Sequence, residues 1–322
     1  MNDDPGVSTI IIFLDTEAYL EEAIKSVLNQ TCTDLELILV DDGSRDGSTT
    51  IAQSYADQYP NKVRYLEHPA HQNCGKGASR NLGIAVSRGE IVAFLDADDV
   101  WLPQKLEQQT EILASHPEAG MLYGNTLYWY GWTNKPEDAR RDFLPDLRVR
   151  QENLIEPLTL LPLFLRGKAA VPSASNMIVR RSILNGVGGF EEDFTGISNI
   201  YEDQAFYAKV CLNYPVIVSN QCWDKYRQHP TATTAVAKKM DQEIDARKFY
   251  LSWLRGYLRN HGIQDQLVWQ ALRQEEWRLH FPGWLPSSQR MRYILRWVKK
   301  WLLKIDDRLV LAAIDHRIWG PD

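Results

Sequence analysis

The residues with the clearest chemical potential stand in one short stretch, FLDADD, at positions 94–99. Three carboxylates, Asp96, Asp98 and Asp99, follow an apolar run that is typical of a buried strand. Two unit charges about 4 Å apart repel by roughly 4 kcal/mol near a protein surface. A helix cap explains one or two of these residues. All three are better explained by a hard divalent cation, which takes carboxylate oxygens and substrate phosphates as ligands.

Rival ways of handling phosphate fit the sequence less well. The chain has no Walker-type loop, and no G-x-G-x-x-G follows its first strand, which disfavours a dinucleotide enzyme. The run from Asp96 to Val100 also fits the motif of haloacid-dehalogenase-type phosphatases, in which Asp96 is the nucleophile. That motif normally ends the first strand of its domain, whereas here it follows several strand and helix signals. A phosphatase therefore stays the weaker alternative.

Two further polar clusters follow apolar runs in the same way. Asp15 and Thr16 end the first run, and Asp41, Asp42 and the Gly-Ser pair behind them end the second. In an open α/β sheet, ligands gather outside the carboxyl ends of the strands, so neighbouring strands would bring these clusters to one crevice. Asp, Gly and Ser also form turns for local reasons, which is the alternative for 41–44.

The elements that must position these residues alternate along the chain. Strand patterns cover 7–14, 36–40, 62–68, 90–95 and 120–126, and helical patterns cover 16–28, the stretch ending near 59, 78–87 and 103–115, with Thr16 as a cap. Further strands are expected over 175–181 and 215–229, around a helix over 201–214. This alternation predicts a parallel, doubly wound sheet with right-handed crossovers.

Several ordered blocks resemble one known family. "VSTIIIFLDTEAYLEEAIKSVLNQTCTDLELILVDDGSRDGST", "KGASRNLGIAVSRGEIVAFLDADDVWLPQKLEQQ", "SNMIVRRSILNGVGGFEEDF" and "YEDQAFYAKV" resemble glycosyltransferase family 2, the inverting GT-A-fold transferases, over about 7–230. The resemblance implies a GT-A-type nucleotide-diphospho-sugar transferase fold, a Rossmann-like, mostly parallel sheet flanked by helices. It also implies sugar transfer from a nucleoside-diphosphate donor, of UDP or dTDP type, to a hydroxyl of a glycan or lipid-linked acceptor.

The same resemblance assigns roles to individual positions. Asp42, with Asp41 beside it, would contact the nucleobase, Asp96 would lie near the ribose, and Asp98 would ligate the Mn²⁺ or Mg²⁺ ion that bridges the diphosphate. The expected nucleotide-sugar-binding residues are Asp15, Asp41, Asp42, Lys76, Arg80, Asp96, Ala97 and Arg227, and the expected metal ligands are Asp98, Asp96 and His229. Arg suits diphosphate oxygens and His can complete a metal shell, although a lone His is more often structural.

The pair Glu202-Asp203 resembles the family's ED motif, in which the Asp is the catalytic base. A base that takes the acceptor proton contributes about 10²–10⁴-fold, and a divalent ion neutralises charge on the departing diphosphate. The alternative is an ordinary charged helix start. One departure concerns the end of the first strand, where relatives often carry a sequence like Pro-Thr-Tyr-Asn and this chain has Phe13-Leu14-Asp15-Thr16. The aromatic residue that would stack on the nucleobase at that place is missing, so the identity of the nucleobase, uridine or thymidine, is left open.

The composition describes an ordinary globular protein with an uneven distribution of charge. The 322 residues are 44% hydrophobic and 24% charged, with a net charge of −6. The part from Lys238 onward is basic and Trp-rich, whereas the rest is acidic, which predicts a catalytic domain over 1–236 and a helical extension over 237–322. Within the extension, 289–304 forms a basic amphipathic pattern that fits a peripheral membrane contact or a docked helix.

Localisation and partners follow from what the sequence lacks. The four cysteines show no metal-binding spacing, no secretory signal is apparent, and no long apolar run predicts a membrane span. We therefore expect a cytoplasmic protein, with peripheral contact at the inner face of the membrane as an alternative, and no nucleic-acid partner. A non-catalytic GT-A scaffold remains the alternative outside enzymes, and the oligomeric state is left open.

Overall fold

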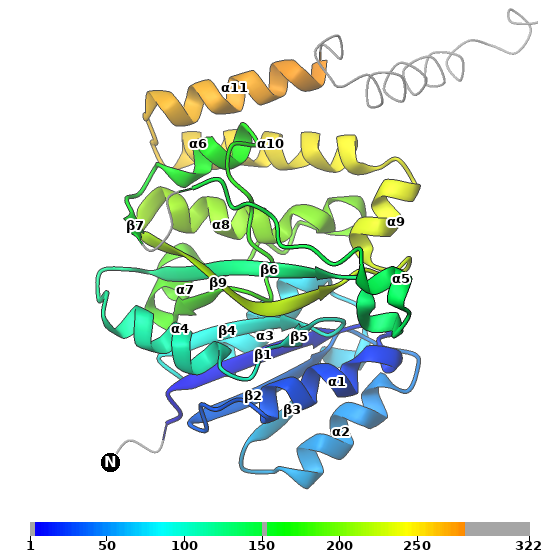
Figure 1. Cartoon of the computed structure of the whole chain (residues 1–322). Coiled ribbons are helices and arrows are strands. Elements are labelled where there is room, and N and C mark those ends of the chain that lie inside the picture. The colour runs from blue at the N-terminus through cyan, green and yellow to red at the C-terminus, as the bar shows by residue number, and fades with distance from the viewer. Residues whose placement is uncertain (1–3, 150–152, 281–322) are drawn as a thin grey trace, which may run out of the picture. The chain divides into compact units, whose positions relative to one another are not determined.

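The computed structural model describes residues 4–149 and 153–280, and contacts divide the chain into two units, Met1–Leu272 and Arg273–Asp322. The strands of the described part are β1 (Val7–Phe13), β2 (Leu35–Asp41), β3 (Val63–Glu67), β4 (Ile91–Asp96), β5 (Val100–Trp101), β6 (Met121–Trp129), β7 (Asn153–Ile155), β8 (Ile178–Arg180) and β9 (Val216–Arg227) (Figure 1). The α-helices are α1 (Glu17–Leu28), α2 (Ser48–Gln58), α3 (Lys76–Val86), α4 (Lys105–Ala114), α5 (Pro136–Ala139), α6 (Leu160–Leu165), α7 (Arg181–Val187), α8 (Glu202–Asn213), α9 (Thr233–Lys239), α10 (Glu243–Asn260) and α11 (Gln266–His280). Short 3-10 helices are η1 (Pro69–His71), η2 (Gly131–Thr133) and η3 (Gly196–Tyr201).

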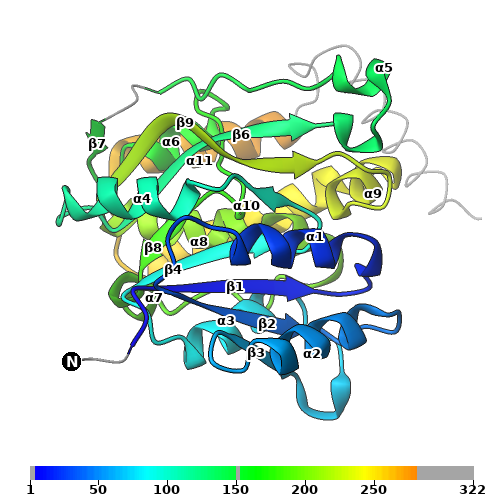
Figure 2. The ribbon, with the colours of Figure 1, turned by 60° about the horizontal axis from the view of Figure 1, so that its bottom comes forward.

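The first unit is built on one sheet. Its strand order is β3-β2-β1-β4-β8-β6-β9-β5, with β7 paired to β9. The pairs within β3-β2-β1-β4 are parallel, as are β6 and β9, while β8 runs antiparallel to both of its neighbours. The expected α/β fold is confirmed, and the β1, β2 and β4 carboxyl ends lie at one edge of the sheet (Figure 2).

Alternation along β1 explains how helices cover both faces. Ile11 and Phe13 belong to the buried cluster that includes the apolar face of α1. Ile10 points the other way, toward α3, because successive strand side chains point to opposite faces. A Cβ added to Gly83 in α3 would stand 2.7 Å from Ile10 Cγ2, so glycine is what lets α3 approach the sheet this closely.

Some local expectations were wrong. The strand expected over 175–181 is confined to Ile178–Arg180 and lies between β4 and β6, so the sheet is mixed in its second half. Thr16 occupies the N-cap position of α1, but its side chain makes no capping bond. Asp46 accepts from the Glu17 N–H at 2.9 Å instead, so the cap comes from the loop after β2.

The C-terminal region is helical as far as it is described. The helix α10 packs on η3 and α8 within the first unit. The described part of the second unit, Arg273–His280, is the end of α11, where Arg278 lies 3.3 Å from Glu275. The division at 236/237 stays a prediction, and the amphipathic segment 289–304 lies outside the described residues. Among the described helices, none has the length and apolarity needed to cross a membrane.

The contact between α3 and β1 gives the first prediction. Gly83→Val should lower the free energy of unfolding by about 1–3 kcal/mol, because the added methyl groups overpack a site closed by buried Ile10. The same change at Gly256 in α10, where no atom lies within 4 Å of an added Cβ, should shift stability by less than about 0.5 kcal/mol. Urea unfolding of both variants checks this, and equal losses would contradict the close α3–β1 packing.

Candidate active site

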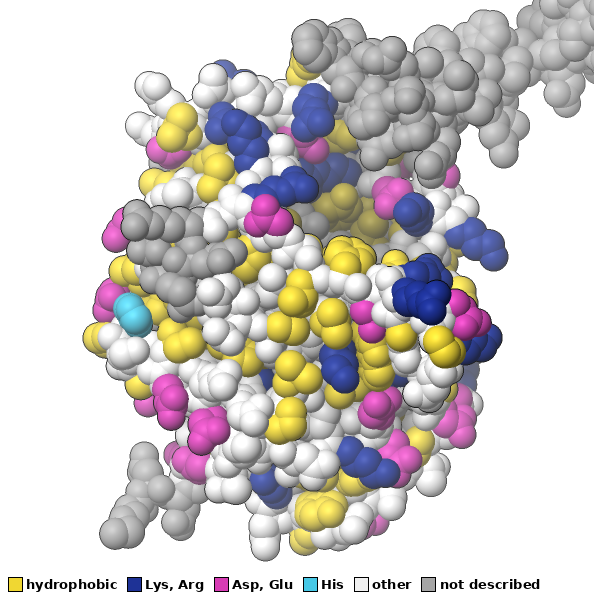
Figure 3. Space-filling model, in the orientation of Figure 1, with side chains coloured by type: hydrophobic (Ala, Val, Ile, Leu, Met, Phe, Trp, Pro, Cys, Tyr) yellow, Lys and Arg dark blue, Asp and Glu magenta, His cyan; other side chains and the backbone are white. Residues whose placement is uncertain are grey.

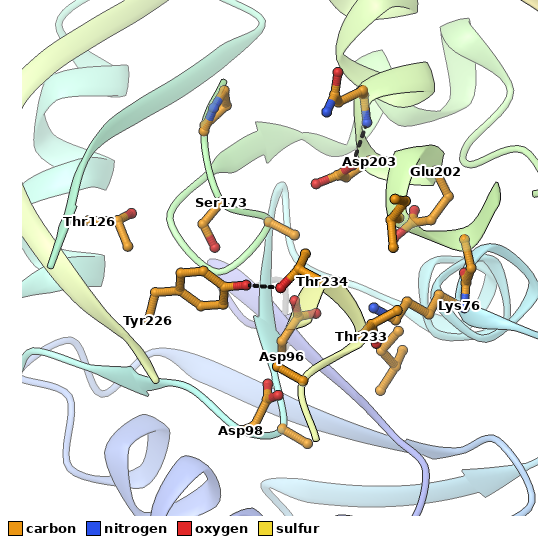
Figure 4. Close-up of a pocket in the computed structure, with 18 of the residues that line it drawn as sticks. Lys76, Asp96, Asp98, Thr126, Ser173, Glu202, Asp203, Tyr226, Thr233 and Thr234 are labelled. Atoms are coloured by element: carbon orange, nitrogen blue, oxygen red, sulfur yellow. Dashed lines mark hydrogen bonds between the residues drawn. The ribbon is translucent and has the colours of Figure 1, made fainter. Parts of the chain in front are cut away.

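A cavity of about 600 Å³ lies at the carboxyl ends of β1 and β4, between them and α8. Its lining includes eight of the residues expected from the sequence: Asp42, Lys76, Arg80, Asp96, Ala97, Asp98, Glu202 and Asp203. In Figure 4, Asp96 and Asp98 lie on one side, Glu202 and Asp203 on another, and the Tyr226–Thr234 hydrogen bond between them. The structure thus brings residues far apart in sequence to one cavity.

Asp42 fixes the entrance of α3 into this cavity. Its Oδ1 accepts hydrogen bonds from the N–H groups of Cys74 at 2.8 Å and Gly75 at 3.0 Å. Gly75 is the N-cap of α3, with φ of +92°, and Lys76 is the first helical residue. The Asp42 carboxylate, itself 5% exposed, therefore sets where Lys76 enters the cavity lining.

Asp41 and Asp15 lie outside the cavity lining. Asp41 is fully buried, and its Oδ1 accepts the N–H groups of Gly43 and Ser44 in a turn that needs glycine at φ +88°. Its other oxygen accepts from the Thr49 hydroxyl at 2.6 Å. Asp15 accepts the Arg45 N–H at 2.7 Å. Both carboxylates shape the loop, which is the turn alternative for 41–44, and neither faces the cavity.

The three carboxylates of the DADD stretch point to different partners. The Asp96 Oδ1 lies 2.6 Å from the Arg80 guanidinium. The Asp98 Oδ2 lies 3.0 Å from Nε2 of His229. Asp99, 1% exposed, accepts from the Ser175 hydroxyl at 2.6 Å and from the Arg227 N–H at 3.0 Å. Their repulsion is thus relieved by separate partners.

The pKa values within this stretch diverge for the same reason. Burial, followed by the charges of Asp98 and Asp96, raises the pKa of the Asp99 carboxyl well above its ordinary value. Burial also acts to raise the pKa of Asp98, but the hydrogen bond from His229 and the charge of Lys76 outweigh it, so that pKa is lowered. Asp98 is therefore an anionic residue of the cavity lining, while Asp99 braces the loop.

Asp98, which lines the cavity, and His229, which is not among the lining residues, are the pair that could hold a metal ion. A carboxylate oxygen and an imidazole nitrogen suit Mn²⁺ or Mg²⁺, and the third candidate, Asp96, is held by Arg80. Across residues 4–149 and 153–280, no group of three His, Cys, Asp or Glu side chains is placed to hold a metal ion. The set fits a divalent cation whose remaining ligands are diphosphate oxygens and water, which is the usual arrangement for Mg²⁺.

Arg227 supports the loop that follows β4. A diphosphate contact was expected of Arg227, but the residue does not line the cavity. Its Nε donates to the Asp98 carbonyl at 2.8 Å, and its terminal nitrogen lies 2.5 Å from Glu22 Oε2. The guanidinium also stacks within 4.6 Å of the Trp129 ring centroid. Trp101 packs behind the same loop, 2% exposed.

Arg80 joins the two sides of the cavity. It is 1% exposed and pairs with Glu202 through one terminal nitrogen and with Asp96 through the other. The Phe190 ring lies 5.2 Å from its guanidinium. Because a buried cation needs compensating charge, this bridge fixes the start of α8 against the end of β4.

Asp203 is the cavity's titratable carboxyl. Burial and the neighbouring charge of Glu202 raise its pKa to about 7, although Arg80 acts in the opposite direction. Its Oδ1 accepts the Gln204 N–H at 2.7 Å (Figure 4), which orients the carboxyl at the first turn of α8. A carboxyl with this pKa is suited to take up a proton near neutral pH.

Three polar atoms of the cavity lining have no hydrogen-bond partner, and one of them belongs to Asn199, a residue that sequence reasoning missed. Thr16 Oγ1, Asn199 Oδ1 and Glu202 Oε2 are buried without a hydrogen-bond partner, and all three residues line the cavity. Buried polar atoms are normally paired, so unpaired ones at a cavity wall indicate where a ligand or water binds. No local motif marks Asn199, because its place in the cavity follows from long-range packing.

The Arg80 bridge gives the second prediction. Arg80→Met should cost about 3–5 kcal/mol of stability in urea unfolding, because Glu202 is left charged and buried. Adding Glu202→Gln should restore part of the loss, which a double-mutant cycle measures.

Arg88 provides the matched control. Its side chain is 47% exposed, and its partner Glu36 keeps Ser8 and Arg64. Arg88→Met should therefore cost less than about 1 kcal/mol. If the two variants lose similar free energies of unfolding, the Arg80 bridge contributes no more to stability than a surface ion pair.

Comparisons with known proteins agree with this geometry. The family model described as glycosyl transferase family 2 matches residues 8–188. A cholesterol galactosyltransferase of Borreliella burgdorferi is 43% identical over 320 residues, which cover 97% of this chain and 81% of that protein. An uncharacterized glycosyltransferase of Nostoc is 33% identical over 182 residues, 56% of this chain, and the chain spans about half of its length, 52%.

Solved structures show the same fold. The mannosyltransferase of Pyrobaculum calidifontis, in complex with GDP-Man and Mn²⁺, superposes with a TM-score of 0.61 at 17% identity, covering 99% of this chain and 82% of that one. S. aureus TarS with UDP gives a TM-score of 0.54 at 19% identity over 76% of this chain and 64% of that one. These likenesses show the GT-A-type fold. Together with the family match over more than half of the sequence, they lead to one conclusion: the chain belongs to glycosyl transferase family 2 and is a glycosyltransferase.

Proposed function

We propose that the chain is a metal-dependent, inverting enzyme that transfers a sugar from a nucleoside-diphosphate donor to a hydroxyl of a glycan or lipid-linked acceptor. The observation that carries the proposal is the placement of Asp203 in the same cavity as Asp96 and Asp98. Asp203 has a raised pKa, of about 7, while the pKa of Asp98 is lowered. Carboxyls whose pKa values are pushed apart suit different roles in one reaction.

In the proposed step, the acceptor oxygen attacks the anomeric carbon. The new carbon–oxygen bond forms as the bond from the anomeric carbon to the diphosphate oxygen breaks, and the electron pair leaves with the nucleoside diphosphate. Asp203 takes the acceptor proton. A divalent cation at Asp98 and His229, when bound, supplies positive charge against the leaving group. Lys76 adds a cation from the N-terminus of α3.

The remaining residues hold this arrangement in place. Asp42 anchors the start of α3, and Arg227 and Asp99 brace the loop that follows β4. Inversion in a single displacement needs no protein nucleophile. The phosphatase alternative, which requires Asp96 as one, draws no support from the family match, and Asp96 is paired with Arg80.

The relatives narrow the compounds to be tested first. The names of the solved structures contain UDP, UDP-GlcNAc and GDP-Man with Mn²⁺, and the Borreliella relative is named for galactose and cholesterol. We take UDP-galactose with Mn²⁺ as the first donor to assay. Cytoplasmic localisation and membrane contact by 289–304 remain proposals.

The third prediction concerns the base. Turnover, as kcat/KM, should rise with pH and level off above about 7, because only deprotonated Asp203 accepts the proton. Asp203→Asn should lower kcat by about 10²–10⁴-fold, since an amide cannot take that proton. Stabilisation by nucleoside diphosphate with Mn²⁺, measured by thermal unfolding, should remain, because Asp98 and His229 are unchanged.

A neighbour supplies the control. Glu202→Gln removes the charge that helps raise the Asp203 pKa, so the midpoint of the pH profile should move below that of the wild type. A profile unchanged by Glu202→Gln, or full turnover in Asp203→Asn, would rule out Asp203 as the base. If nucleoside diphosphate stabilises the protein equally with and without Mn²⁺, the proposed metal dependence is wrong.

A further inference from the structure

The cavity has two chemically different walls. The donor side carries Asp42, Lys76, Asp96 and Asp98, all of which can be charged. A second wall comes from the chain between β6 and β8, and its lining residues include no charged side chain. Its lining residues are Pro145, Leu147, Ala170, Val171, Pro172, Ser173 and Ala174.

This apolar wall is a fixed part of the first unit. The Ala170 N–H donates to the Leu147 carbonyl at 3.0 Å, which ties its two strips together. Leu147 and Ala174 are each 3% exposed, so they are packed from behind, while Val171 is half-buried. A preformed apolar wall favours an apolar ligand surface, because contact between the two removes apolar area of both from water.

Two unpaired, buried acceptor oxygens belong to residues that neighbour the base in the sequence. Glu202 is 2% exposed and its Oε2 has no partner, and Asn199 Oδ1 is likewise buried and unpaired. Both residues line the cavity with Asp203. These oxygens can accept hydrogen bonds from a hydroxyl group, and a hydroxyl there would lie next to the proposed base. Among the seven wall residues, Ser173 alone carries a polar side chain.

Exposed apolar side chains continue from the wall to the surface. Phe143 and Leu144, which directly precede Pro145, are 47% and 51% exposed. Phe143 stacks on Tyr128, another cavity residue, with ring centroids 4.8 Å apart. Hydrophobic side chains also gather over the middle of the face in Figure 3, where β6 and β9 run in Figure 1. Phe143 and Leu144 therefore add apolar surface beside Pro145, next to the exposed charges of Asp146 and Arg148.

From these observations we propose that the acceptor is a lipid alcohol, whose apolar body packs on the wall of Pro145, Leu147, Val171 and Pro172 and whose hydroxyl points to Asp203. This inference rests on the proposed function and narrows its acceptor from a glycan or lipid to one class. A glycan carries hydroxyls around each ring, and several of them would face the apolar wall without partners.

Acceptor competition tests the class. The assay uses the full chain with Mn²⁺ and a donor that the enzyme turns over. The kcat/KM for a long-chain or polycyclic alcohol in micelles should exceed the kcat/KM for soluble mono- and oligosaccharides at least about tenfold. Higher efficiency with the soluble sugars would overturn the inference and leave the proposed function standing.

Substitutions in the wall test the site. Val171→Asp should raise the KM for the lipid alcohol at least about tenfold, because it places a carboxylate against the apolar body, and Val171→Thr should give a smaller rise. Thermal stabilisation by nucleoside diphosphate reports that each variant is folded. The control Leu267→Asp changes a side chain that is 58% exposed and does not line the cavity, so its KM should equal that of the wild type. Unchanged KM in both Val171 variants would contradict the inference.

A binding measurement separates the two proposals. If no donor is turned over with any acceptor, the proposed function fails, and equilibrium binding of a radiolabelled long-chain alcohol in the presence of nucleoside diphosphate decides the inference alone. Saturable binding that Val171→Asp weakens at least about tenfold supports the apolar subsite. Binding that does not saturate, or that is equal in the variant, overturns it.

Discussion

The arrangement of the cavity depends on one buried ion-pair bridge, from Glu202 through Arg80 to Asp96. Arg80 comes from α3, Glu202 from the first residue of α8 and Asp96 from the end of β4. Removing a charge from water is unfavourable by several kcal/mol unless a partner compensates it, so each of the three residues restricts where the others can lie. This requirement fixes the position of the donor side of the cavity, with Asp96, relative to the base side, with Glu202.

The same bridge tunes the chemistry. Burial and the adjacent Glu202 raise the pKa of Asp203, whereas Arg80 limits the rise. The result is a carboxyl that titrates near neutral pH, beside an Asp98 whose pKa is lowered by His229 and Lys76. Asp99 is buried under the loop and holds the Arg227 backbone and Ser175. Four acidic residues of similar sequence character thus acquire different roles from burial and partners alone.

The sequence predicted the parts of this site that depend on local pattern. Strands β1, β2 and β4 are continuous apolar runs, and the polar residues after them reach one edge because parallel strands end together. It could not tell Asp42 from Asp41, since the direction of each carboxylate depends on the turn at Gly43 and on the backbone of Cys74 and Gly75. The placement of β8 between β4 and β6 likewise follows from long-range pairing.

The apolar wall was the least predictable feature. Pro145, Leu147 and residues 170–174 belong to no helix or strand, and their common property, lining one cavity with Asp203, exists only in the folded chain. Similarly, the support that Arg227 and Asp99 give to the loop after β4 depends on the pairing of β9 with β5 and β6. Contacts between distant segments therefore decide which of the chemically suitable residues face the substrate.

The central claim is a single displacement at the anomeric carbon with Asp203 as base and no covalent intermediate. The anomeric configuration of the first-formed product, read by proton NMR from the coupling between H1 and H2 of the transferred sugar, tests it most directly. Starting from an α-linked donor such as UDP-galactose, the account predicts a β-linked product. An α-linked product would mean that configuration is retained, which contradicts direct displacement by a base-activated acceptor.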